Sequence, residues 1–532
     1  MQSRNADLEE FFSHEVQPFP PSLSEFGNLR LPSAKSELLK CLIPSTQAEP
    51  PTQFDCSVLD GAVVVHCLPV TGSNTFDDYA HNVFIPHLSR QRSTRVDVVW
   101  DTYIPNSLKE STREKRGKGV RRKVDGGTKL PSNWVSFLRD PLNKEELFHF
   151  LSLKVARHNW PERKTIHVTS GTSVISIGSA TAMTDCTHEE ADTRIVVHIL
   201  HAIQVEEAKT VLVRTVDTDV LVILVGKLHD PKEVQPELDL WLAFGMGRNF
   251  RFISVNCICA ILGKPQSTSL PVFHALTGCD TTSGFFGKGK KSAWQAWEIF
   301  PEVTPTFEML AKTPFMQLTT DSPLFKQIER YTVIMYDKLS PLSDINLTRM
   351  ELFCKNGRTM DKLPPTQDAL LQHVRRAVFQ AGIWTVGDQP QPHVPSPGQF
   401  SWSEDDGKWV PKWITILEVS KACSELIKCS CKGACTRCKC AKASLVLMNI
   451  SAKFGAFVTS VTIRPILSHK RPDYSKLHLN PKGSAATNFI RFLKGEQHVS
   501  PRRPRRSSTE DFHTIANQLL MTLLAGTSRT LR

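Results

Sequence analysis

The stretch AKTVLVRTVDTD, residues 208–219, places two aspartates directly after an apolar run. The apolar part, 208–215, has the density of a buried strand, and an amphipathic helical pattern at 188–204 precedes it. Strands that alternate with helices are typical of an α/β domain with a mainly parallel sheet. The sequence therefore predicts an α/β fold in which Asp217 and Asp219 stand at the end of a strand.

Acidic residues also fall at the ends of other predicted elements. A strand-like run at 56–68 is interrupted at Asp60, and a second strand at 93–101 closes on Asp101. The carboxyl ends of neighbouring parallel strands lie at one edge of a sheet, where ligands bind, so acids far apart in sequence can converge there. A single aspartate after a strand is more often a turn or helix-cap residue, but an ordered set is poorly explained by chance. The set is Asp60, Asp101, Glu190, Asp192, Asp217, Asp219 and Asp280.

Carboxylates that converge repel one another, and this repulsion raises their pKa values. Divalent cations remove the repulsion, and a ligand set made only of oxygen atoms suits Mg²⁺ or Mn²⁺. Two such ions about 3.5–4 Å apart orient a water molecule and clamp a scissile phosphate. We therefore expect the acidic set to hold two ions and to support hydrolysis of phosphodiester bonds.

A turn rich in glycine and lysine follows Asp280 in the stretch HALTGCDTTSGFFGKGKKSAW, residues 274–294. Glycines let main-chain N–H groups approach a phosphate, and lysines add positive charge. An exposed basic loop without a ligand is the alternative. The candidate DNA-binding residues are Gly284, Gly287, Gly289, Lys288, Lys290 and Lys291.

The order of these motifs resembles the PIN-like nuclease superfamily, in particular its flap endonuclease/XPG-type branch, over roughly residues 55–300. The stretch VVWDTYIPNSLKESTREKR (98–116) is similar to the family's second motif. EAD (190–192) resembles its E-A-E motif with aspartate in place of the second glutamate, and DTD resembles its D-x-D. GCD (278–280) resembles the family's G-x-D ahead of a helix–hairpin–helix.

This resemblance implies a three-layer PIN-like domain that cleaves DNA, or alternatively RNA, with two Mg²⁺ or Mn²⁺ ions. It also implies that Lys109 and Arg116 reach the scissile phosphate from one face of a helix. Seven positions separate the two residues, which places them on one helical face, although a solvated face is the other interpretation. A protein that keeps the fold but has lost catalysis, such as a nucleic-acid-binding or chromatin adaptor, is the alternative function.

Six cysteines lie close together in CSELIKCSCKGACTRCKC, residues 423–440. Thiolates at this spacing favour zinc, and the stretch resembles one half of a tesmin-type CXC domain, which binds zinc and DNA. A reduced loop without zinc is the alternative. Together with a PIN-like core, this segment resembles a group of animal proteins for which an origin in mobile elements is a hypothesis. The candidate zinc ligands are Cys423, Cys429, Cys431, Cys435, Cys438 and Cys440.

The composition favours a folded protein that binds nucleic acid. The chain has 532 residues, 40% of them hydrophobic, and a net charge of +12, which allows a sizeable core and excludes global disorder. The basic excess gathers at 109–123 and 446–532, as expected for contact with nucleic acid. No signal peptide or membrane-spanning run is expected, so the cysteines are expected to be reduced. The basic run PRRPRR (501–506) favours the nucleus, with the cytoplasm as the alternative, and no protein partner is indicated.

Composition changes along the chain predict five regions. We expect a weakly ordered extension at 1–50 and a PIN-like nuclease domain at 51–300 with a basic arch-like insertion at about 106–164. A helical region with a Pro-rich linker follows at 301–420. The last two regions are the cysteine segment at 421–445 and a basic, disordered tail at 446–532.

Overall fold

The computed structural model describes residues 8–32, 34–43, 49–110, 119–356 and 359–416. The described residues of 18–416 form one compact unit, and α1 (Leu8–Ser13) lies outside it. Arg116, the six clustered cysteines and the basic tail lie outside the described residues, so what we expect of them stays a prediction.

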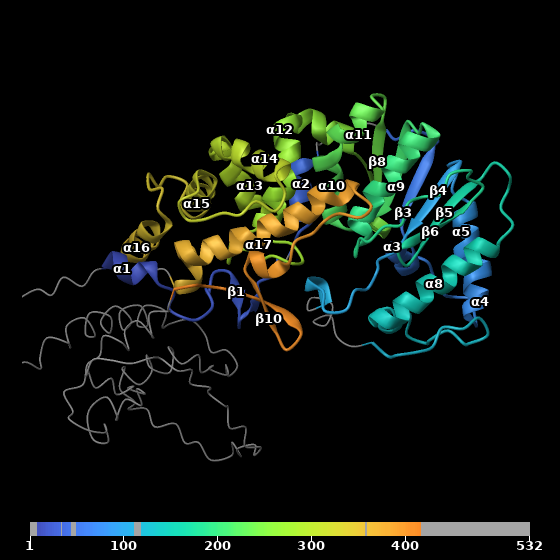
Figure 1. The fold of residues 1–532 in the computed structure, drawn as a ribbon, viewed down its shortest axis with the longest axis horizontal. Coiled ribbons are helices and arrows are strands. Elements are labelled where there is room, and N and C mark those ends of the chain that lie inside the picture. Colours follow the sequence, from blue (N-terminus) through green and yellow to red (C-terminus); the bar gives the residue numbers. More distant parts are fainter. Residues whose placement is uncertain (1–7, 33, 44–48, 111–118, 357–358, 417–532) are drawn as a thin grey trace, which may run out of the picture. The chain divides into compact units, whose positions relative to one another are not determined.

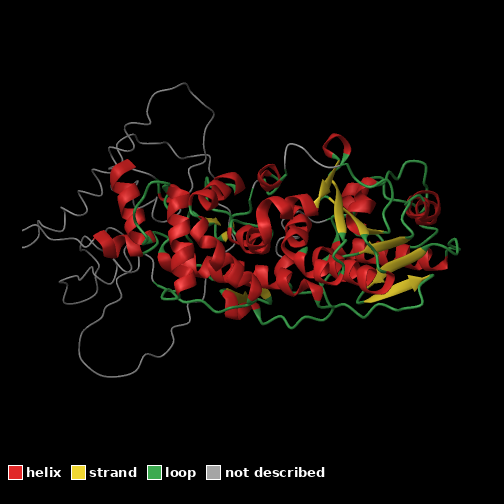
Figure 2. Ribbon diagram, turned by 90° about the horizontal axis from the view of Figure 1, so that it is seen from above, coloured by secondary structure: helices red, strands yellow, loops and turns green. Residues whose placement is uncertain are grey.

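A mainly parallel sheet of seven strands lies in the larger unit (Figures 1 and 2), with the order β6-β5-β4-β3-β7-β8-β9. Only β6 and β9, at the two edges, run antiparallel to their neighbours. This arrangement confirms the predicted α/β fold. The strands are β3 (Cys56–Asp60), β4 (Arg95–Val99), β5 (Thr165–Ser170), β6 (Ser173–Ile177), β7 (Thr210–Thr215), β8 (Asp239–Phe244) and β9 (Arg251–Ser254).

Helices cover both faces of the sheet and give three layers, as the resemblance implies (Figure 1). Strands buried on both faces are rich in apolar residues, and every residue of β3 and β4 is buried. One face carries α3 (Gly61–Cys67), α4 (Phe76–Tyr79), η1 (Ala80–Phe84), α5 (Ile85–Ser89), α7 (Trp134–Phe137) and α8 (Pro141–Arg157). The other carries α9 (Ala191–Glu206), α10 (Thr218–Lys227), α11 (His229–Val234) and α12 (Val255–Leu276).

The stretch 106–164 is not an arch-like insertion throughout, because α8 belongs to the central layers. Leu147, Leu151 and Val155 of α8 are fully buried in the same cluster as Val98 and Val168 of the sheet. These apolar side chains recur every four residues, so they form one buried stripe. The part of the stretch from 134 to 157 therefore builds the core.

A buried ionic network fixes α9 to the opposite face of the sheet. The Arg95 guanidinium donates two hydrogen bonds to Asp97, of 2.8 and 2.7 Å. Asp97 also lies 2.7 Å from Nδ1 of His198, which comes from α9. Both charges are paired and hydrogen-bonded, as buried charges need to be. The network sets the position of α9, whose first turn carries predicted site residues.

The region after α12 is helical, as predicted, and lies in the same compact unit as the sheet. Its core contains the aromatic rings of Trp297, Phe307 and Tyr331, and Trp297 stacks on Phe273 of α12. The longer elements are α13 (Lys290–Ile299), α14 (Thr304–Lys312), α15 (Pro323–Tyr336), α16 (Ile345–Asn356) and α17 (Gln367–Thr385), with the hairpin β10 (Trp402–Asp405) and β11 (Lys408–Pro411). Short turns are η2 (Gly247–Asn249), η3 (Pro301–Val303), η4 (Met360–Lys362), η5 (Val386–Asp388) and η6 (Pro397–Phe400). No helix in the described ranges is long and apolar enough to span a membrane.

The N-terminal segment 18–43, expected to be weakly ordered, is folded over its described residues. It contains a short hairpin, β1 (Ser24–Glu25) with β2 (Asn28–Leu29), and a helix, α2 (Glu37–Leu42). Leu38, Leu39 and Leu42 of α2 are buried, and α2 packs against α13. Burial of these leucines on the helical layer supplies the stability that the proline and serine content of the segment had hidden.

Gly61, the residue after Asp60, lies against the ring of Trp100. A Cβ atom at Gly61 would come within 2.2 Å of that ring. The ring cannot easily move, because it stacks on Phe148 at 4.3 Å and on Phe84 at 5.8 Å between centroids. Glycine at this position therefore lets β3 turn directly into α3.

We expect Gly61→Ala to lower the free energy of unfolding by about 1–3 kcal/mol, because the added methyl group overpacks the Trp100 site. Urea denaturation measures the change. Gly127→Ala is the matched control, since a Cβ atom there meets nothing within 4 Å. Equal stability of the two variants would contradict the packing argument.

Candidate metal centre

The predicted acids gather at the point where the strand order reverses. From β3 the chain adds β4 and β5 on one side, and it then returns to place β7 and β8 on the other side. The helices that follow β3 and β7, α3 and α10, cover opposite faces, so the carboxyl ends of these two strands form the switch point at which open α/β sheets bind ligands. Asp60 ends β3, and Asp217 follows β7 by two residues.

Three of the acids form a group that could hold a metal ion. One carboxylate oxygen from each of Asp192, Asp217 and Asp219 lies within 4.8 Å of the others. Asp192 stands in the first turn of α9 and Asp219 in the first turn of α10, so both helices begin at the centre. The donors are all carboxylate oxygens, which fits Mg²⁺ or Mn²⁺. Asp192, although shorter than glutamate, reaches the other two.

A second group of acids adjoins the first and is tied to the backbone around it. Asp60 caps α3 by accepting from the Val63 N–H at 3.1 Å, and it also accepts from the Thr215 hydroxyl at 3.3 Å. Asp101 accepts from the N–H of Ala191 at 2.9 Å, which links the end of β4 to the start of α9. That bond places Glu190, the N-cap residue of α9, beside Asp101.

Burial and mutual repulsion raise the pKa values of most of these acids. Burial, with the nearby charges of Asp101 and Asp217, raises the pKa of Asp60 to about 7. Burial likewise raises the pKa of Glu190 to about 7, although Lys109 opposes the shift. Burial and the charge of Asp219 raise the pKa of Asp217 to about 6. These shifts are the electrostatic cost that convergent carboxylates carry without a metal ion.

Two lysines supply positive charge inside the centre. The Lys109 ammonium forms an ion pair with Glu190, and the residue is 8% exposed. Lys35, which the sequence analysis did not select, lies 3.1 Å from Asp219 Oδ2 and 2.5 Å from Asp280 Oδ1. Asp280 therefore belongs to the centre through its contact with Lys35. Lys35 lies in the segment predicted to be weakly ordered, so no local pattern indicated its role.

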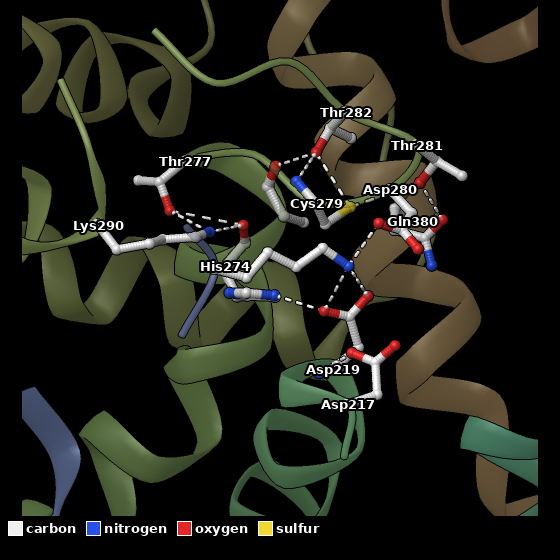
Figure 3. A network of polar contacts seen from close by, with 12 residues as sticks. Asp217, Asp219, His274, Thr277, Cys279, Asp280, Thr281, Thr282, Lys290 and Gln380 are labelled. Carbon is white, nitrogen blue, oxygen red and sulfur yellow. Dashed lines mark hydrogen bonds and ion pairs between the residues drawn. The ribbon is translucent and has the colours of Figure 1, made fainter. Parts of the chain in front are cut away.

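His274 is a second residue that the sequence analysis did not assign. Its Nε2 lies 2.9 Å from Asp219 Oδ1, and Figure 3 shows His274, Asp219 and Asp280 gathered near the start of α10. Burial lowers the pKa of His274 to about 4, so the ring is neutral and donates its Nε2–H to the carboxylate. Although burial opposes the shift, Lys35 and His274 hold the pKa of Asp219 well below its usual range. Asp219 is thus ionised at neutral pH, whereas Asp217 takes up a proton when the pH falls to about 6.

The structure changes the predicted DNA-binding set at the glycine–lysine turn. Gly284 is buried, and its N–H donates to the carbonyl of Arg30 at 2.7 Å. Lys290 is 2% exposed, and its ammonium donates to the His274 carbonyl at 2.7 Å and the Thr277 hydroxyl at 2.8 Å. Neither residue is available to a phosphate, because the N-terminal segment and the end of α12 use their donors.

The other four predicted residues, in the turn and at the start of α13, remain candidates for DNA binding. Gly287, Gly289 and Lys291 are exposed. Lys288 is half-buried, with its ammonium over the ring of Tyr336 at 5.2 Å from the centroid. The turn joins α12 to α13 and so gives the predicted arrangement of two helices around a hairpin.

A scan against protein-family models and a search of curated protein sequences find no match for this chain. Among solved structures, the chain is similar to the catalytic core of Rad2 in complex with DNA substrate. The sequences are 13% identical, the match covers 58% of this chain and 91% of that chain, and the TM-score is 0.26.

Substitution of two adjacent lysines, Lys290 and Lys291, distinguishes a structural role from a role in DNA binding. We expect Lys290→Met to lower the free energy of unfolding by about 1–3 kcal/mol, because two buried acceptors lose their donor. Lys291→Met is expected to change it by less than about 0.5 kcal/mol and to weaken binding to duplex DNA. Urea denaturation and fluorescence anisotropy measure the two effects. The reverse pattern would show that Lys290, not Lys291, serves the duplex.

The raised pKa values predict how Mg²⁺ stabilises the protein as pH changes. In the metal-free protein Asp60 and Glu190 hold protons up to about pH 7 and Asp217 up to about pH 6. The unfolded chain releases these protons near pH 4. Between about pH 4 and pH 7 the folded protein therefore holds more protons than the unfolded chain, and the free energy of unfolding falls as the pH rises. Mg²⁺ binds the ionised carboxylates, and at low pH it must displace protons to do so.

We therefore expect Mg²⁺ to raise the Tm more at about pH 8 than at about pH 5.5, with a difference of about 1–3 °C. Thermal unfolding with and without Mg²⁺ at both pH values measures this. Asp217→Asn is expected to lose the Mg²⁺-dependent increase at the higher pH. An increase that is independent of pH would contradict a carboxylate site.

Proposed function

We propose that this protein is a nuclease that depends on divalent cations and hydrolyses phosphodiester bonds in DNA. The observation that carries the proposal is the group of Asp192, Asp217 and Asp219, whose carboxylate oxygens lie within 4.8 Å of one another. The group lies at the carboxyl ends of parallel strands, where α/β proteins bind ligands. Four further acids surround it, which is more negative charge than a structural ion pair requires.

Mg²⁺ or Mn²⁺ would be held by the three grouped aspartates, with Asp60, Asp101 and Glu190 beside them. Such an ion, when bound, lowers the pKa of water and stabilises the charge that develops on a phosphate. Among the chain's own residues, Glu190 has a pKa of about 7 and can exchange a proton near neutral pH. Lys109, which is paired with Glu190, would donate a hydrogen bond from its ammonium to a phosphate oxygen that enters the centre.

DNA is the favoured substrate because lysines follow Asp280 closely in the sequence and one of them, Lys291, is exposed. Asp280 lies at the centre, Lys288 follows it on the turn before α13, and Lys291 stands in the first turn of α13. They would contact the backbone of a duplex whose scissile phosphate lies at the acids. The basic tail, zinc at the cysteine segment and a nuclear location are further parts of the proposal, and they rest on the sequence alone.

A second candidate function is a nucleic-acid-binding protein without catalysis. The observation that favours it is the pairing of Lys35 with Asp219 and of Lys109 with Glu190, because both ammonium groups lie where cations would bind. In this second candidate, the acids paired with lysines form a network that stabilises the fold and does not bind metal ions. The two candidates differ in whether phosphodiester bonds are cleaved.

Cleavage of branched and linear DNA, with Mg²⁺ and with EDTA, tests the proposal. We expect Mg²⁺-dependent cleavage by the wild-type chain and a loss of at least about a hundredfold in Asp217→Asn, because the ion loses a ligand. Asp321→Asn is the control, since Asp321 is exposed and distant in the sequence from the strand ends. An RNA substrate of the same sequence separates DNA from RNA specificity.

Equal cleavage by the wild type and Asp217→Asn would indicate a contaminating nuclease and remove the support for catalysis. DNA binding that persists in EDTA, without cleavage in Mg²⁺, would favour the second candidate.

A further inference from the structure

An ammonium group lies among the acids where a second cation would be expected. Nζ of Lys35 is 3.1 and 3.2 Å from the two carboxylate oxygens of Asp219, and 2.5 Å from Asp280. These are the hydrogen-bond distances of a lysine whose donors are all engaged by carboxylates. Lys35 therefore bridges two of the seven acids.

The backbone around Lys35 is attached to the protein on both sides. Before it, the carbonyl of Ser22 accepts from Phe286 N–H at 2.7 Å, and the carbonyl of Arg30 accepts from Gly284 N–H at 2.7 Å. After it, α2 begins at Glu37 and buries its leucines against α13. Lys35 is thus delivered to the acids by a folded segment, not by a loose chain end.

Both carboxylate oxygens of Asp219 already accept hydrogen bonds on the side that faces Lys35, which leaves few lone pairs there for a divalent ion. Its Oδ1 accepts from both Lys35 and His274, and its Oδ2 accepts from Lys35. A divalent ion placed between Asp219 and Asp280 would meet the Lys35 ammonium at short range, and the two positive charges would repel each other. Lys35 has no hydrogen bond to Asp192 or Asp217, so an ion bound to these two together with Asp219 does not have to displace the ammonium from Asp280. The ion still lies within reach of that positive charge, because the charge of Asp217 also acts on Lys35.

We propose that Lys35 takes the place of the second cation, so that the centre holds one divalent ion, at Asp192, Asp217 and Asp219, instead of the two expected from the sequence. This inference rests on the proposed function, because it assumes that the three-aspartate group binds a metal. Lys35 supplies a fixed single positive charge beside Asp219 and Asp280. Unlike a metal ion, it brings no exchangeable water, so it positions charge without providing a second hydrolytic site.

The number of Mn²⁺ ions bound per chain tests the inference, measured by titration calorimetry and electron paramagnetic resonance on the full chain. We expect Lys35→Met to bind one more Mn²⁺ ion than the wild type, because the position between Asp219 and Asp280 becomes free. Lys35→Arg keeps the positive charge and is expected to bind the same number as the wild type. Lys40→Met is the matched control, since Lys40 lies on the same segment but pairs with the exposed Glu37.

Equal ion counts for the wild type and Lys35→Met would overturn the inference and leave the nuclease proposal intact. If Asp217→Asn bound as many ions as the wild type, the three-aspartate site, and with it the proposed function, would fail instead. Counting the difference between variants removes any contribution of Mn²⁺ bound elsewhere in the chain.

A second variant keeps the inference testable if Lys35→Met does not fold, which circular dichroism reports. Asp280→Asn in the wild-type chain removes a partner of Lys35 and no ligand of the proposed single ion. We expect the Mn²⁺ affinity of this variant to stay within about threefold of the wild type, whereas the loss of a ligand or an outer-shell partner costs about 10–100-fold. A loss of tenfold or more would show that Asp280 binds metal and that Lys35 does not replace an ion.

Discussion

Repulsion between carboxylates gathered at one edge of the sheet is the constraint around which the site is built. Burial removes the water that would screen these charges, and Asp60, Glu190 and Asp217 consequently keep their protons to about pH 6–7. Lys35 and Lys109 supply positive charge within the cluster but do not balance seven acids. A divalent cation offers more charge at a shorter distance, which is why carboxylates in this geometry point to a metal.

The topology of the sheet supplies the convergence. Because β3 lies in the middle and the chain extends the sheet first on one side and then on the other, the carboxyl ends of β3, β4 and β7 meet at one edge of the sheet. Helix capping and metal binding are compatible here: Asp60 and Asp217 each use one carboxylate oxygen to cap a following helix. The same bonds that begin α3 and α10 hold these side chains at the centre, so the local structure orients the acids in advance.

The N-terminal segment contacts both the turn after Asp280 and the acidic centre. It covers the turn after Asp280, where Arg30 accepts from Gly284, and it sends Lys35 to the acids. The first two residues of α13 therefore differ: Lys290 is buried and bonded to the end of α12, whereas Lys291 is exposed. A lysine-rich turn is consistent with both roles, and only burial distinguishes them.

The sequence by itself determined the alternation of strands and helices and the order of the acids along it, because apolar periodicity and residues at strand ends are local properties. It did not reveal α8 in the basic stretch 106–164, since the charges there obscured the apolar stripe at Leu147, Leu151 and Val155. The partners of the charged groups were decided by tertiary structure alone. Lys35 and Asp219 are 184 positions apart, and only the packing of α2 brings them together. Charge pairing depends on distance in space and on the exclusion of water, and the residues that neighbour a charged group in the sequence determine neither.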